Sequence, residues 1–296
     1  MMKKRQDTAE NLHEAIEQTK KRSPACGNIL DAFGELIIAR TCFRQELSLP
    51  DTDDALKPDP IRFSQGLAVL SGKTLTFDKS LYLKAAECLF PAMEKGFPKA
   101  ARDIHAAKKA IAENRLSPEL FLQALLSGED EIFLKTGKEL KMAPQLLRFV
   151  MGQMMKPFLE KQAEMLKPLL QNLQWHKGYC AVCGSYPELS LLKGETGERW
   201  LKCSVCAYEW RFVRANCPVC EDQNAKGMEL LFLEDRPQER AELCHVCKKY
   251  LIGFDLRKFP REIFLDIERL GALHLDVAAQ EKGFFPMAES AWSVID

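Results

Sequence analysis

Long apolar runs are missing from this sequence, and so is a secretory signal. No segment approaches the roughly 20 consecutive apolar residues that a membrane-spanning helix needs. The basic opening Met1–Arg5 is followed by polar residues, whereas a signal peptide would continue into an apolar stretch. These two absences predict a cytoplasmic protein that does not insert into membranes.

The familiar sequence motifs of enzymes are missing as well. No phosphate-binding loop, dinucleotide fingerprint, nucleophile elbow or metalloprotease helix is present. Neither sign of charge dominates, because 42 Lys and Arg balance 42 Asp and Glu. The sequence therefore contains none of these enzyme motifs, and its charge balance indicates neither a polyanionic partner nor an acidic tail.

Cysteine, in contrast, is plentiful, with eleven residues in the chain. In a reducing compartment we do not expect so many thiols to form disulfides. Three of them (Cys26, Cys42 and Cys88) are isolated and are expected to be buried thiols. The other eight form four Cys-x-x-Cys pairs, which are Cys180/Cys183, Cys203/Cys206, Cys217/Cys220 and Cys244/Cys247.

Pairs of this spacing are typical of metal sites. Each Cys-x-x-Cys turn, or knuckle, points two sulfurs at one ion, and two knuckles complete the tetrahedron that zinc prefers and that iron adopts in all-sulfur sites. Nineteen residues separate the first pair from the second, and twenty-three separate the third from the fourth, which leaves room for a hairpin in each gap. The sequence thus predicts two four-cysteine sites holding zinc or iron, with the pairs joined sequentially. A crossed pairing, first with third and second with fourth, is the alternative.

Zinc ribbons, which are hairpin modules built around such four-cysteine sites, can also bind nucleic acids. The charge of the cysteine-rich region bears on that function. Residues 175–258 contain 13 Lys and Arg against 12 Asp and Glu. Two four-cysteine groups on divalent metals would add four negative charges and leave the stretch at roughly −3. Modules that bind phosphates normally have a basic face, so we expect no nucleic-acid partner.

The pattern of apolar residues divides the chain into a helical part and a ribbon part. An apolar stripe at helical spacing runs from 143 to 173, whereas 209–214 and 250–256 alternate as strands do. Residues 193–198 supply a hairpin turn, and helical character returns after about 261. We predict an α+β multidomain protein with an all-α helical domain (1–173), two rubredoxin-like or zinc-ribbon β modules (174–212 and 213–260), and a C-terminal helix and tail (261–296).

Several other side chains are candidates for a functional role. His176 and His245 flank knuckles, but eight cysteines already fill two tetrahedra, so we expect both histidines to be exposed or to lie just outside the ligands. His274 is expected to be an ordinary core or surface histidine. The methionines of the long helix resemble an adaptable binding surface, but we expect them to pack in the core; they are Met151, Met154, Met155 and Met165.

Five stretches of the sequence have the same order of residues as a known protein family. They are 180–185, 199–206, 209–220, 242–251 and 266–284. In these stretches the chain resembles the FdhE family of formate dehydrogenase accessory proteins. The likeness is specific from about Tyr179 to Phe284, and over the helical half it is one of length and helical character.

The resemblance implies a function. Members of this family are cytoplasmic, are not enzymes themselves, and are needed to form active formate dehydrogenase, whose catalytic subunit they are thought to contact. It also implies a helical domain followed by two rubredoxin-like modules. The alternatives are an iron protein that transfers electrons during metalloenzyme maturation and a zinc-ribbon protein that binds nucleic acid.

Overall fold

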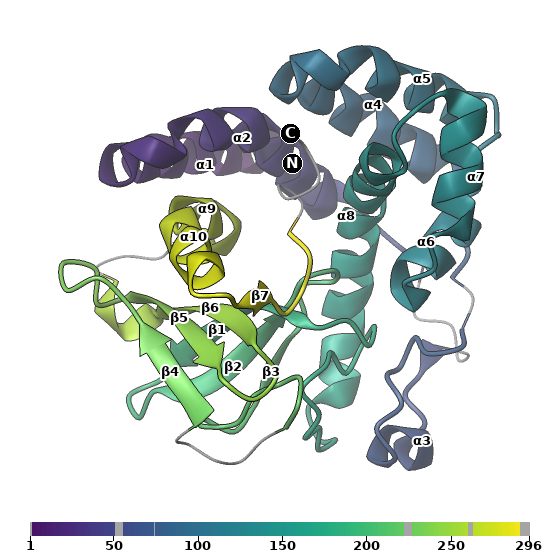
Figure 1. The fold of residues 1–296 in the computed structure, drawn as a ribbon. Coiled ribbons are helices and arrows are strands. Elements are labelled where there is room, and N and C mark those ends of the chain that lie inside the picture. Colours follow the sequence, from purple (N-terminus) through teal and green to yellow (C-terminus); the bar gives the residue numbers. More distant parts are fainter. Residues whose placement is uncertain (1, 51–55, 74, 222–226, 260–262, 291–296) are drawn as a thin grey trace. The chain divides into compact units, whose positions relative to one another are not determined.

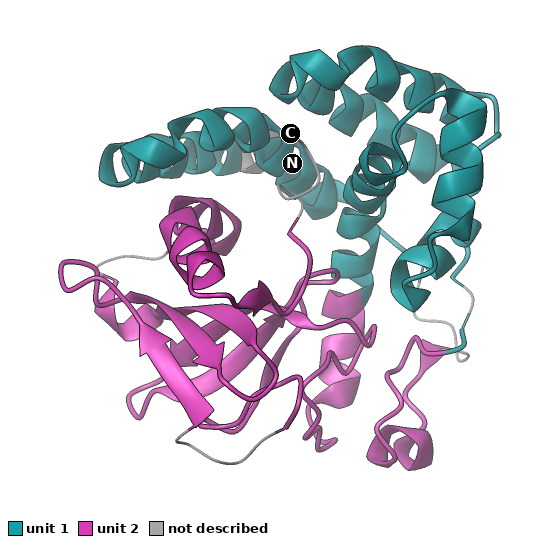
Figure 2. Cartoon of the chain, in the orientation of Figure 1, with its two compact units in different colours: residues 1–51, 72–162, 291–296 teal, residues 52–71, 163–290 magenta. Residues whose placement is uncertain are grey.

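The chain folds into two compact units (Figure 1, Figure 2). The computed structural model describes residues 2–50, 56–73, 75–221, 227–259 and 263–290. Unit 1 contains residues 1–51, 72–162 and 291–296, and unit 2 contains residues 52–71 and 163–290. The finer division into four segments at 173, 212 and 260 stays a prediction.

Unit 1 is helical, as the apolar pattern predicts. Its centre is α2, which packs against α1 and α4, and three phenylalanine rings (Phe33, Phe97 and Phe149) meet edge to face with centroids 4.9–5.9 Å apart. The helices are α1 (Met2–Arg22), α2 (Gly27–Glu46), α4 (Lys79–Gly96), α5 (Ala101–Ala112), α6 (Pro118–Ser127), α7 (Glu131–Leu140) and the first part of α8 (Pro144–Leu170). The rest of α8, from Ala163, belongs to unit 2.

Short polar side chains set the beginnings of these helices. At α6 the Ser117 hydroxyl accepts a hydrogen bond from the Leu120 amide (3.4 Å), and Pro118 occupies the first helical position, where its missing N–H costs nothing. Asp78 caps α4 in the same way, through the Leu81 amide at 3.0 Å. Such caps satisfy amides that have no partner within the helix.

Unit 2 is built on one mixed sheet whose strands run in the order β3-β2-β1-β6-β5-β4. The first ribbon, defined as β1–β3, forms an antiparallel meander, and the predicted turn at 193–198 links β1 to β2. The second ribbon, defined as β4–β6, is a second antiparallel meander. The strands of the sheet are β1 (Pro187–Lys193), β2 (Glu198–Cys203), β3 (Glu209–Arg211), β4 (Met228–Leu231), β5 (Glu239–Cys244), β6 (Lys249–Asp255) and β7 (Phe285–Pro286), which pairs with β6.

The two ribbons join through a parallel pairing of β1 with β6, from Leu189 opposite Ile252 to Leu192 opposite Asp255. The α+β fold class predicted from the sequence is confirmed, with a helical N-terminal part and two four-cysteine ribbons in the C-terminal half. The continuous sheet is an addition to that prediction, because local periodicity carries no information on which distant strands pair.

Two short helices, α9 (Leu265–Gly271) and α10 (Leu273–Glu281), stand where the sequence predicts a single C-terminal helix. Their apolar side chains pack with those of β1, β5 and β6 to form the core of unit 2. The buried members are Leu189, Leu191, Ala241, Leu243, Tyr250, Ile252, Phe254, Ala272, Leu275, Ala279 and Phe284. Residues 261, 262 and 291–296 of the predicted C-terminal segment lie outside the described residues.

Unit 2 also includes a short segment that precedes α4 in the chain. It contains α3 (Pro60–Ser64), whose first amides are capped by the Asp59 carboxylate at 2.8 and 3.3 Å. Within the described part of the chain, no helix combines the length and the apolar character needed to cross a membrane.

Candidate metal centres

The first cluster of cysteines joins the knuckle before β1 to the knuckle after β2. Cys180 Sγ lies 3.5 Å from Cys206 Sγ, and Cys183 Sγ lies 3.4 Å from Cys203 Sγ. All four side chains are buried, with exposed fractions of 6% or less. The β1–β2 hairpin, folded back at residues 194–197, is what brings these two knuckles together.

The second cluster joins the knuckle before β4 to the knuckle between β5 and β6. Cys217 Sγ lies 3.6 Å from Cys247 Sγ, and Cys220 Sγ lies 3.6 Å from Cys244 Sγ. Cys217 and Cys244 are buried, but Cys220 is exposed and Cys247 is half-buried. The two clusters therefore differ in access to solvent, although each consists of four cysteines.

The geometry of both clusters fits a tetrahedral metal ion. Within each cluster all four sulfurs lie within 4.8 Å of one another. A Zn–S bond of about 2.3 Å places sulfurs about 3.8 Å apart in a tetrahedron, whereas a disulfide needs about 2.0 Å. Each cluster could thus hold one metal ion, and the knuckles are grouped sequentially, first with second and third with fourth.

All four knuckles end in the same backbone conformation. The residue that follows each second cysteine has positive φ: Gly184 (82°), Ala207 (54°), Glu221 (53°) and Lys248 (57°). This left-handed residue turns the chain back so that both sulfurs of a knuckle point to one side, and the Val182 amide donates to Cys180 Sγ at 3.3 Å. Only the first knuckle has a glycine there, so the sequence pattern of the other three gives no sign of the turn.

The first knuckle is covered by a segment from far upstream in the chain. The amides of Val69 and Leu70 donate to the carbonyls of Ala181 (2.9 Å) and Val182 (2.8 Å), the two residues between the first pair of cysteines. Ala68, Val69 and Leu70 are themselves buried. This covering segment, residues 66–71, shields the first knuckle from solvent, and no sequence motif predicts it.

Burial and contacts among the sulfurs shift the pKa values of the thiols in opposite directions. Hydrogen bonds with the other three cysteines hold the pKa of Cys183 well below its usual range. Burial raises the pKa of Cys180 and of Cys206 well above the usual range and raises the pKa of Cys217 as well. It raises the pKa of Tyr208 to about 12, with a further contribution from the charges of Cys180 and Cys206. A cation supplies the compensating charge that buried thiolates need, so metal binding and loss of thiol protons are linked.

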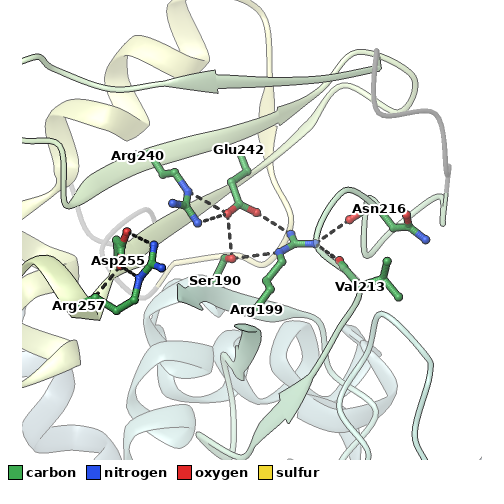
Figure 3. A network of polar contacts seen from close by, with 8 residues as sticks. All are labelled: Ser190, Arg199, Val213, Asn216, Arg240, Glu242, Asp255 and Arg257. Atoms are coloured by element: carbon green, nitrogen blue, oxygen red, sulfur yellow. Dashed lines mark hydrogen bonds and ion pairs between the residues drawn. The ribbon is translucent and has the colours of Figure 1, made fainter. Parts of the chain in front are cut away.

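A buried polar network connects the two ribbons (Figure 3). Arg199 of β2 donates to the Glu242 carboxylate of β5 at 2.6 Å and to the Ser190 hydroxyl of β1 at 3.1 Å. Ser190 and Arg240 donate to the other oxygen of Glu242, at 2.9 and 3.0 Å. Burial alone would raise the pKa of Glu242, but Arg199 and Arg240 hold it below its ordinary value.

The same arginine fixes the loop that leads into the second cluster. Arg199 Nη1 donates to the carbonyls of Val213 (2.9 Å) and Asn216 (2.8 Å), and Asn216 directly precedes Cys217. The segment before the first knuckle also meets the third knuckle: a Cβ atom at Gly178 would lie 1.8 Å from the Pro218 carbonyl oxygen, so only glycine fits. Through these contacts the first ribbon determines the position of the third knuckle.

The other side chains that the sequence suggested for a functional role lie outside the two cysteine clusters. The His176 ring contacts Gln174, the His245 ring contacts Glu229 at 2.8 Å, and both histidines are exposed. His274 Nε2 lies 3.8 Å from the buried Glu239. Met151, Met154 and Met155 are fully buried and Met165 is half-buried, while Cys26 and Cys42 are buried and Cys88 is half-buried.

The difference in exposure predicts two rates of metal loss. With a chelator in excess, we expect one ion per chain to be lost at least about tenfold faster than the other, because exposed Cys220 admits competing ligands that the buried first cluster excludes. A colorimetric chelator gives the time course, and Cys220→Ser should abolish its fast phase only. Equal rates for both ions would contradict this expectation.

The central part of the ribbon region matches a family model described as "FdhE, central domain", over residues 179–214. Among curated proteins, the chain is 30% identical over 166 residues to a "Protein FdhE homolog" of Aquifex aeolicus, an alignment that covers 55% of this chain and 58% of that protein. It is 37% identical over 112 residues to the homolog of Pseudomonas aeruginosa, covering 36% of each chain. The alignments thus span between about a third and three fifths of these relatives.

A solved structure extends the similarity in fold to nearly the whole chain. The crystal structure of the FdhE protein from Pseudomonas aeruginosa aligns with a TM-score of 0.68 and 23% sequence identity, over 95% of this chain and 93% of that chain. The fold described above is therefore similar to one that has been solved by crystallography.

Proposed function

Because this chain belongs to the FdhE family, we propose that it is an accessory factor needed to form active formate dehydrogenase. It acts in the cytoplasm by binding the catalytic subunit of that enzyme and has no catalytic activity of its own. The observation that carries this proposal is the closed sulfur shell of both clusters, in which four cysteines occupy all four tetrahedral positions. Such a site leaves no position for a reacting water or substrate.

A binding role also requires a surface that keeps its shape. Eight cysteines lie at the turns of the sheet, and metal binding there would rigidify it. The second ribbon exposes large apolar side chains at Leu230 (54%), Phe232 (51%) and Val246 (61%). Leu230 lies in β4, Phe232 directly follows it, and Val246 lies in the turn between β5 and β6. Exposed apolar side chains of this size are common in protein contact surfaces.

The proposed cofactors are two metal ions per chain, zinc or iron. One is bound by Cys180, Cys183, Cys203 and Cys206, and the other by Cys217, Cys220, Cys244 and Cys247. Zinc would serve a structural role only, whereas iron in the same sulfur shell would add a one-electron couple.

An anaerobic pull-down of the tagged, full-length chain from its own cells tests this function. We expect mass spectrometry to identify a formate dehydrogenase catalytic subunit, and we expect its yield to fall at least about tenfold with Cys180→Ser/Cys183→Ser, because the first ribbon then loses its metal. Cys88→Ser, a change outside both clusters, is the matched control and should keep the subunit. Recovery of another redox enzyme, or of nucleic acid, would contradict the proposed partner.

Electron transfer is a second candidate, and the exposure of Cys220 favours it, since a redox metal must lie near the surface to exchange electrons with a partner. An iron-loaded protein would show a ferric-thiolate absorption band that bleaches reversibly with dithionite. A colourless protein that retains two zinc ions when isolated without oxygen would exclude this function. The pull-down and the spectrum give independent results.

A further inference from the structure

A groove of about 920 Å³ lies beside β3 in unit 2. One wall is formed by β2 and β3 with the segment that follows them. The other wall is formed by the C-terminal end of α8, through Lys167 and Leu170, and by residues 173–176. A groove between a helix and the edge of a sheet has the form of sites that accept an added strand.

The backbone of β3 faces this groove with unused hydrogen-bonding groups. β3 is an edge strand, and its hydrogen bonds to β2 fall at alternate residues: the Phe212 amide donates to the Arg199 carbonyl (3.0 Å), and the Cys203 amide donates to the Tyr208 carbonyl (2.9 Å). In an antiparallel pair, the residues between such positions direct N–H and C=O to the other side. Glu209 and Arg211 are those residues, and no backbone group of the described chain pairs with them there.

Aromatic side chains line the groove and are held in place. The Trp210 indole donates to the Lys177 carbonyl (3.1 Å), and the Trp175 indole donates to the Tyr179 carbonyl (2.7 Å). Their ring positions are thus fixed. Trp210 is itself buried, so the apolar area open to an occupant comes from the partly exposed Trp175, Trp200 and Tyr208. Rigid aromatic rings bury an incoming apolar side chain at a low cost in conformational entropy.

The charge of the groove favours an acidic occupant. Its two carboxylates already have partners: Glu198 pairs with Arg211 at 3.0 Å, and Glu209 pairs with Lys193. Buried Arg199 is paired with Glu242. Lys167 and Arg214 also line the groove, and in the described part of the chain no carboxylate pairs with either, which leaves two basic groups uncompensated.

From these observations we propose that the groove binds an extended peptide segment of a partner protein, which adds to β3 as a further antiparallel or parallel strand. Its backbone pairs with the outward N–H and C=O groups of Glu209 and Arg211. An aromatic or aliphatic side chain of the segment packs on the partly exposed Trp175 and Tyr208 rings, and acidic residues beside it meet Lys167 and Arg214. The proposal holds for any partner with this chemistry and does not depend on formate dehydrogenase.

Selection from a phage-displayed library of random dodecapeptides, on the immobilised, metal-loaded full chain, tests the proposal. We expect selected peptides to alternate apolar with acidic residues, and their synthetic versions to slow hydrogen exchange at the Glu209 and Arg211 amides. Arg211→Pro removes an N–H that points into the groove without breaking a hydrogen bond to β2. This variant should bind the peptides at least about tenfold more weakly. Arg211→Thr removes the same side chain, keeps the N–H, and should bind within about threefold of the original chain.

A second pair of variants tests whether binding requires the two basic residues of the groove. Lys167→Glu/Arg214→Glu should weaken the selected peptides about tenfold, whereas Lys99→Glu/Lys135→Glu, the same charge change on exposed residues of unit 1, should not. The proposal is overturned if no peptide is enriched, if Arg211→Pro binds as well as Arg211→Thr, or if the protected amides lie elsewhere. None of these outcomes bears on whether the chain binds formate dehydrogenase.

Discussion

Replacing Cys203 with serine will remove the metal ion of the first cluster and unfold the first ribbon. Metal binding contributes on the order of 10 kcal/mol to the folding of small zinc domains, which is comparable to the whole stability of a typical domain. A serine hydroxyl does not replace a thiolate ligand, and here it would also be buried, since Cys203 has no exposed surface. The ribbon is therefore expected to unfold rather than to loosen.

Two measurements check this outcome. Metal analysis should show about one ion per chain or fewer in place of two, and limited proteolysis should cut within residues 175–215, where the original chain resists. Cys88→Ser in α4 is the matched control, because that thiol lies in unit 1 and in neither cluster. Two retained ions and an unchanged digestion pattern in Cys203→Ser would show that the cluster is not a metal site.

Replacing Arg199 with methionine is expected to lower the free energy of unfolding by about 3 kcal/mol. The change leaves Glu242 as a buried carboxylate, although Arg240 still donates to it at 3.0 Å and limits the loss. It also removes the donor to the Val213 and Asn216 carbonyls ahead of Cys217. We therefore expect faster chelation of the second ion, with the first ion unaffected.

Denaturant unfolding of the metal-loaded chain measures this loss. Arg211→Met is the matched control: its ion pair with Glu198 is on the surface, with the arginine side chain 69% exposed, so its loss should stay below about 0.5 kcal/mol. The double variant Arg199→Met/Glu242→Leu leaves no buried carboxylate without its arginine partner. It should therefore regain part of the free energy of unfolding that Arg199→Met loses. An Arg199→Met variant as stable as Arg211→Met would contradict a structural role for the network.

The sign of the pH dependence follows from the direction of the Glu242 shift. Its pKa is lowered in the folded chain, so the carboxylate binds a proton more readily in the unfolded chain. The stabilisation of the fold by the Arg199–Glu242 pair is therefore fully present above the pKa that Glu242 has in the unfolded chain, about 4.3. It is lost as the pH falls through the lower, folded pKa, and Arg199→Met should show less of this acid-dependent loss.

Local features of the sequence predicted how the cysteines are grouped. The spacing of the eight cysteines predicted their grouping into two four-cysteine clusters, because a Cys-x-x-Cys turn and a hairpin are both local structures. The Ser117-Pro118 cap and the turn at 193–198 were readable for the same reason. The contrast between helical and alternating apolar periods distinguished the helical half from the ribbons.

The sequence by itself thus determined the two cysteine clusters, the ribbons and the helices, since each depends on residues close together in the chain. Only the tertiary structure decided how the two sites differ, because that depends on contacts between distant residues. Residues 66–71 cover the first knuckle from far upstream in the chain, while exposed Cys220 is left in the second cluster. The pairing of β1 with β6 and the reach of Arg199 to Glu242 likewise join the ribbons through contacts for which local periodicity carries no signal.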